Sequence, residues 1–141
     1  MVEKVLDALT IKLHELYDLK IYFNAPNQNM ATPCFLISVG ETTIKSALPP
    51  RKQVSLPLVI QLISDKKYSR KEMFGIGYHL SNELEYVLSV EGDVIRGSNI
   101  SYEVDDELMS LYITFDFYVQ SVITTENDMT KMIGQVGVKN G

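Results

Sequence analysis

The stretch from Gln53 to Ser64, QVSLPLVIQLIS, constrains the fold more than any other part of the chain. Every even-numbered position from Val54 to Leu62 is apolar, whereas the odd-numbered positions are mixed. A period of two over this length predicts a β-strand that commits one face to a hydrophobic core. Pro57 lies inside the stretch and has no N–H group, so we expect the strand to lie at a sheet edge or to carry a bulge there.

A second alternating stretch, Leu108 to Val119, predicts another long strand. Its apolar face comprises Met109, Leu111, Ile113, Phe115, Phe117 and Val119. Before it, residues 90–104 predict two short strands, around Asp93–Arg96 and Asn99–Val104, which Gly97-Ser98 joins. The turn at Asp105-Asp106 favours antiparallel pairing between the second of these and the last strand.

Two helices are expected. The first covers residues 2–18, where leucines and valine recur at spacings of three and four. The second begins at the capping box formed by Ser69 and Glu72 and reaches about residue 89. Gly75 and Gly77 lie inside this second helix and should let it approach the sheet closely.

Shorter pieces complete the pattern. Leu19–Phe23 is extended, residues 24–32 form a loop, and Pro33–Glu41 is a strand with apolar residues on both faces, which favours a central position. Residues 42–52 form a polar connection that projects as an excursion or a hairpin tip. The fold class is therefore α+β, a mostly antiparallel sheet with two helices packed on one face.

The chain of 141 residues suits a single domain, which we place at residues 1–121. In residues 122–141 the apolar periodicity weakens, and we expect either a flexible C-terminal tail or an arm that crosses to another subunit. The net charge of −5 argues against a protein whose main function is to bind nucleic acid. No signal peptide or membrane span is expected.

The residues that could carry chemistry are few. Cys34 reads as a small buried hydrophobe, and a single cysteine excludes an internal disulfide. His14 and His79 read as helix surface residues, and the acidic run from Glu103 to Glu107 lacks the spacing of a calcium loop. We therefore expect no catalytic residues, no cofactor and no metal site. A hidden enzyme or ligand-binding site that includes one of the histidines is the alternative.

One basic cluster is open to two interpretations. It comprises Lys66, Lys67, Arg70 and Lys71 and lies where the second helix begins. It is either a solvated loop and helix start or a docking patch.

Several segments resemble a family of small tail proteins of tailed bacteriophages, the tail terminator (tail completion) family. That family has an I-Y pair, a polar loop with a Gln and a P-C-F-F-I strand, which Ile21-Tyr22, Gln28 and Pro33–Ile37 match except for Leu36. The order of later elements is similar: a long alternating strand, a helix with an L-x-x-x-L stripe, a strand with Arg96-Gly97 and an acidic turn before an aromatic strand. The resemblance covers about residues 5–120. The long strand lacks the aromatic-Pro ending of the family, and the last strand lacks its His-Phe pair.

This resemblance implies a structural protein rather than an enzyme. Family members form a ring, usually of six copies, on the head-proximal end of the tail tube, where the ring stops tube polymerisation. The implied partners are other copies of the chain, the tube protein and a sheath or neck protein, with DNA passing through the lumen. The implied location is the bacterial cytoplasm during assembly and then the tail of a phage, prophage particle or phage-tail-like bacteriocin. A neck or head-tail connector protein of the same particle is the alternative.

Overall fold

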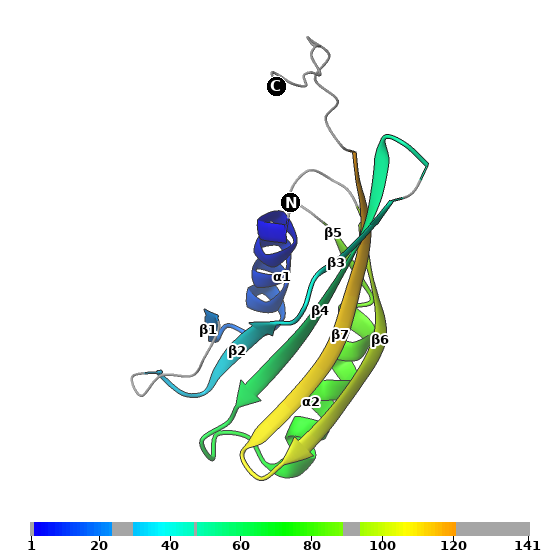
Figure 1. The fold of residues 1–141 in the computed structure, drawn as a ribbon. Coiled ribbons are helices and arrows are strands. Elements are labelled where there is room, and N and C mark those ends of the chain that lie inside the picture. The colour runs from blue at the N-terminus through cyan, green and yellow to red at the C-terminus, as the bar shows by residue number, and fades with distance from the viewer. Residues whose placement is uncertain (1, 24–29, 47, 89–93, 121–141) are drawn as a thin grey trace. The chain divides into compact units, whose positions relative to one another are not determined.

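The computed structural model describes residues 2–23, 30–46, 48–88 and 94–120 (Figure 1). Two compact units make up the chain: Met1–Thr43 with Val54–Phe117, and Ile44–Gln53 with Tyr118–Gly141. The helices are α1 (Val2–Leu16) and α2 (Arg70–Glu83). The strands are β1 (Lys20–Phe23), β2 (Cys34–Val39), β3 (Thr43–Ser46), β4 (Arg51–Ile63), β5 (Tyr86–Leu88), β6 (Val94–Asp105) and β7 (Leu108–Gln120).

The strands form one sheet in the order β1-β2-β4-β7-β6-β5, and β3 pairs with β4. β1 runs parallel to β2, whereas the β2–β4, β5–β6 and β6–β7 pairs are antiparallel. Ser55 bonds to Asp116, and Gln61 bonds to Ser110. The residue number rises along β4 from the first bond to the second, whereas it falls along β7. The β4–β7 pair is therefore antiparallel too. The predicted α+β class with a mostly antiparallel sheet is confirmed.

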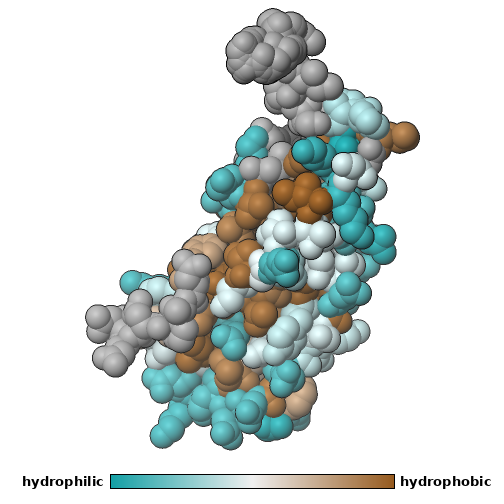
Figure 2. All heavy atoms as spheres, viewed as in Figure 1, coloured by the Kyte–Doolittle hydropathy of each residue, from teal (hydrophilic) through white to brown (hydrophobic). Residues whose placement is uncertain are grey.

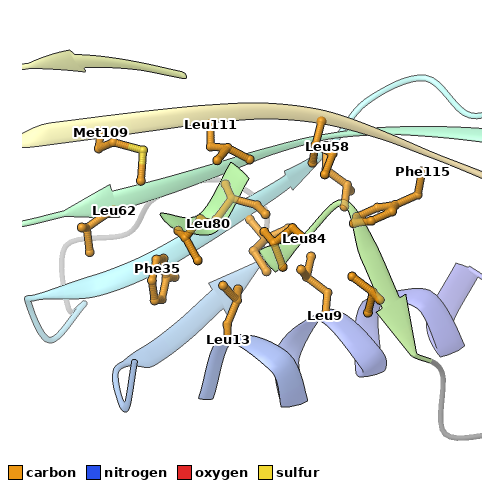
Figure 3. Packing of buried hydrophobic residues seen from close by; sticks show 14 of the residues in the cluster. Leu9, Leu13, Phe35, Leu58, Leu62, Leu80, Leu84, Met109, Leu111 and Phe115 are labelled. Atoms are coloured by element: carbon orange, nitrogen blue, oxygen red, sulfur yellow. The ribbon is translucent and has the colours of Figure 1, made fainter. Parts of the chain in front are cut away.

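The alternating positions of β4 and β7 face one hydrophobic core, as the sequence predicts. Even-numbered residues of β4 and odd-numbered residues of β7 are buried in the same cluster as side chains of both helices. Figure 3 shows Leu9 and Leu13 of α1 and Leu80 and Leu84 near the C-terminal end of α2 converging on Phe35 and the β4 and β7 side chains. Both helices therefore cover the same face, and Figure 1 shows α2 behind β7 and β6.

The position of Pro57 corrects one expectation, because β4 is an interior strand between β2 and β7. The Gly40 N–H donates to the Pro57 carbonyl at 2.8 Å, so the backbone polar groups of Pro57 point toward the β2 side. The N and O atoms of one strand residue point to the same neighbour. On that side β2 has ended at Val39 and β3 begins only at Thr43, so the missing N–H coincides with an interruption of the ladder. Buried and half-buried residues alternate without a break from Val54 to Leu62, so β4 itself does not carry the bulge that was the other alternative.

The start of α2 is confirmed and its end is corrected. The Ser69 hydroxyl accepts from the Glu72 N–H, and the Glu72 carboxylate accepts from the Ser69 N–H, which completes the capping box. The helix ends at Glu83 rather than near residue 89, and Tyr86–Leu88 form β5. The Gly97 N–H donates to the Glu85 carbonyl at 2.7 Å, which ties the chain beyond the helix to β6.

The two short strands expected in residues 90–104 are one strand, β6, within the part of the chain that the structure describes. Gly97 does not turn the chain: a Cβ there would lie 2.7 Å from the Leu84 carbonyl oxygen and 2.6 Å from the Ile113 Cδ1. The pairing of β6 with β7 shifts in register between Ser98 and Ser101, where Asn99 has a φ of 51°. The expected loop at residues 24–32 lies partly, and the expected tail at 122–141 wholly, outside the described residues.

Candidate assembly surfaces

The structure places His14 at the surface and Cys34 in the interior. His14 is exposed on α1, with its Nδ1 3.9 Å from a carboxylate oxygen of Asp18. Cys34 is buried, and this burial raises the pKa of its thiol, which favours the unreactive neutral form. No group of three His, Cys, Asp or Glu residues within the described ranges could hold a metal ion. None of the helices described is long and apolar enough to cross a membrane.

The second histidine has a structural contact that the sequence did not reveal. The Tyr17 hydroxyl and the His79 Nδ1 are 2.8 Å apart, with the two rings edge to face. Burial, with a smaller contribution from Tyr68, raises the pKa of the Tyr17 hydroxyl. The His79 Nε2 is 3.9 Å from a Glu83 carboxylate oxygen, and Glu83 also pairs with Lys12 at 3.3 Å. These contacts join α1 and its C-terminal extension to α2.

The sheet face away from the helices carries a network of hydroxyl and carboxylate groups. The Asp116 carboxylate on β7 accepts from Ser55 on β4 at 2.7 Å and from Ser98 on β6 at 2.8 Å. Gln61 on β4 donates to Ser110 on β7 at 3.2 Å. Side chains thus join three adjacent strands, and hydrogen bonds to an ionised carboxylate are stronger than neutral ones. Figure 2 shows this face, with hydrophobic residues flanked by residues of intermediate hydropathy.

The basic cluster and the acidic run meet at one end of the first unit. Lys66, Lys67, Arg70 and Lys71 are exposed, as are Glu103, Asp105, Asp106 and Glu107. The Lys66 N–H donates to the Glu107 carboxylate at 2.6 Å, and the Ser64 N–H donates to the Glu107 carbonyl at 2.8 Å. The β4–α2 turn is therefore fastened to the β6–β7 turn. Figure 2 shows hydrophilic residues at this end.

Large hydrophobic side chains are exposed on both helices. Ile11 on α1 is 48% exposed, whereas on α2 Phe74 is 44% and Tyr78 65% exposed. The Arg70 guanidinium lies 5.7 Å from the centre of the Phe74 ring. Phe74 and Tyr78 are neighbours on the helix surface because four residues separate them, and adjacent exposed apolar groups are candidates for contact with another protein.

The second unit contains the tip of the β3–β4 hairpin, so of the two alternatives for the polar connection at 42–52 the structure shows the hairpin tip. Its turn is closed by a 2.9 Å bond from the Arg51 N–H to the Leu48 carbonyl. All four residues of β3 are exposed, Ile44 by 62%, and Leu48 in the turn by 83%. The Arg51 guanidinium lies 4.5 Å from the centre of the Tyr118 ring. The hairpin tip (Ile44–Gln53) thus presents two apolar side chains on an ordered turn.

Comparison with known families indicates the kind of protein to which these surfaces belong. The family model of the phage tail terminator protein matches residues 4–129. The chain belongs to the phage tail terminator family. The resemblance drawn from residues 5–120 is therefore confirmed, and the match continues into the segment that begins at residue 122.

Membership of the phage tail terminator family makes the chain a structural protein of phage tail assembly. It acts in the tail of the virion and interacts with other tail proteins. No curated protein matches the chain.

Proposed function

We propose that this chain caps the head-proximal end of a phage or phage-like tail tube as a ring of six copies and stops tube polymerisation. The match of residues 4–129 to the phage tail terminator family carries the proposal. The ring binds the last layer of tube protein on one side and presents a surface for a neck or sheath protein on the other.

The exposed surfaces support a ring physically. A closed ring is built from heterologous contacts, in which each copy uses two different surfaces. The helix faces and the hairpin tip are separate surfaces, each with large apolar side chains in water. Burying one leucine or isoleucine side chain contributes about 1.5–3 kcal/mol. We assign the hairpin tip, with Ile44 and Leu48, to the contact with the tube.

Net charge bears on the passage of DNA. The chain carries a net charge of −5, so six copies repel phosphate groups rather than bind them. A negatively charged lumen lets DNA pass through the ring without binding to its wall. A ring structure with a basic lumen would contradict this part of the proposal.

The test is tail length, measured by negative-stain electron microscopy with and without the gene. Overlong tubes of variable length in the deletion support the terminator role. Tails of normal length that fail to join heads indicate a neck protein instead, and unchanged particles overturn the proposal.

Complementation of the deletion tests the hairpin tip. Leu48→Asp removes an exposed apolar group that the fold does not use, so the protein should fold normally and fail to restore tail length. Leu48→Met keeps the apolar volume and serves as the matched control. Equal length control by both variants would remove the hairpin tip from the tube contact.

A further inference from the structure

The exposed stripe of α1 is acidic around an apolar centre. Asp7, Ile11 and Glu15 follow one another at intervals of four residues, so they share one face of the helix, and all three are exposed. Asp18 follows just beyond the helix with a fully exposed side chain. We call Asp7, Ile11, Glu15 and Asp18 the acidic helix face.

The exposed stripe of α2 has the opposite charge. Arg70, Phe74 and Tyr78 also recur at intervals of four, and Lys71 lies beside Arg70. The Arg70 guanidinium already lies against the Phe74 ring. We call Arg70, Lys71, Phe74 and Tyr78 the basic helix face. Lys66 and Lys67, both exposed, precede it and add to its positive charge.

The two faces do not satisfy each other within one copy. α2 meets α1 through a different stripe, His79 and Glu83, which contact Tyr17 and Lys12. These two residues lie on another side of α2 from Phe74 and Tyr78, because five and nine residues separate them from Phe74 rather than four or eight. The acidic and basic helix faces therefore stay available for another molecule.

We infer that the chain associates head to tail, with the basic helix face of one copy docked on the acidic helix face of the next. This rests on the proposed function, since it names the subunit contact of the ring. Contact between two acidic faces, or between two basic faces, would bring like charges together. Charge complementarity thus disfavours contact of either face with its own copy and favours acidic-on-basic contact, which closes a ring when each copy docks on the next. Ile11, Phe74 and Tyr78 supply the apolar centre of this contact, and the charges set its orientation.

The experiment uses two charge-reversed forms of the full-length chain. One carries Asp7→Lys with Glu15→Lys, and the other carries Arg70→Glu with Lys71→Glu. Each form alone has two faces of the same sign, so its association should weaken at least tenfold and its mass should fall to that of a monomer. An equal mixture restores every contact in an alternating ring and should recover the mass of the wild-type assembly.

Mass is measured by sedimentation or light scattering, and circular dichroism verifies that each variant is folded. Glu41→Lys with Ser101→Lys and Tyr112→Lys changes the net charge by the same amount as the first variant, at exposed positions outside both helices, and should assemble like the wild type. A wild-type chain that is a monomer or stops at a dimer, a mixture that stays monomeric, or equal loss in this control would overturn the inference.

The outcomes separate this inference from the proposed function. Overlong tails in the deletion, together with charge-reversed chains that still assemble alone, would leave the terminator role standing and remove the helix contact. If the mixture recovers the wild-type mass but tails keep their normal length in the deletion, the helix contact would stand and the terminator role would fall.

Discussion

Gly75 and Gly77 lie two residues apart on α2, and replacing each by alanine should change stability in opposite directions. A Cβ at Gly75 meets nothing within 4 Å. Alanine there gains helix propensity alone, about 0.5–1 kcal/mol. A Cβ at Gly77 would lie 2.5 Å from the Tyr102 Cδ2 and 2.9 Å from its Cγ. Overpacking of this kind costs about 1–3 kcal/mol.

The propensity gain is the same at both positions, so the difference between the two variants isolates the steric cost. We expect Gly77→Ala to unfold about 1–3 kcal/mol more easily than Gly75→Ala, or several degrees lower in melting temperature. Urea unfolding of the full-length chain, followed by far-UV circular dichroism, measures both.

A third background sharpens the test. The Tyr102→Ser variant lacks the ring, so adding Gly77→Ala to it should raise the free energy of unfolding. A double-mutant cycle of the two substitutions should therefore show coupling between them. If Gly77→Ala matches Gly75→Ala within about 0.5 kcal/mol in the wild-type background, the close approach of α2 to β6 is refuted.

Three further predictions concern single side chains. Ser69→Ala removes the capping box and should cost about 1 kcal/mol by urea unfolding; an unchanged midpoint would show that the cap is not used. Asp116→Asn weakens two hydroxyl bonds and should cost roughly 1–2 kcal/mol, whereas Asp106→Asn on the exposed turn should stay within about 0.5 kcal/mol. Burial raises the pKa of the Tyr17 hydroxyl in the folded state. The protonated hydroxyl therefore contributes fully to the free energy of unfolding below the unfolded-state pKa of about 10, and this contribution is lost as the pH rises through the folded-state pKa. Tyr17→Phe should therefore flatten the alkaline fall of the urea midpoint, and an unaltered slope would contradict this.

The sequence correctly predicted those elements that depend on residues close to one another in the chain. The alternation in β4 and β7 follows from burial of one face, and the capping box at Ser69 needs only residues three apart. The end of α2 was mistaken because Val87 continues the apolar spacing of Leu80 and Leu84, so nothing in the stripe marks the change to β5. What ends the helix is pairing with β6, a tertiary contact.

The assembly surfaces were only partly predictable for the same reason. Exposure of the basic cluster follows from its charge, and a hairpin tip was one of two alternatives for the connection at 42–52. The contact of Tyr17 with His79 joins residues 62 positions apart, and no sequence spacing encodes it. The two oppositely charged helix faces became visible only when burial showed which stripes face water.

The register shift in β6 changes which residues of this strand can serve the core. Before the shift the buried positions are the odd-numbered Ile95 and Gly97, and after it the inward-facing positions are the even-numbered Tyr102 and Val104. One extra residue therefore reverses the parity of the strand. Deleting Asn99 would make the ladder regular and would leave Tyr102 and Val104 facing inward, because the deletion removes only the extra residue. A single insertion or deletion elsewhere in this strand would reverse the side chains beyond it, whereas the turn between β6 and β7 is free of that constraint.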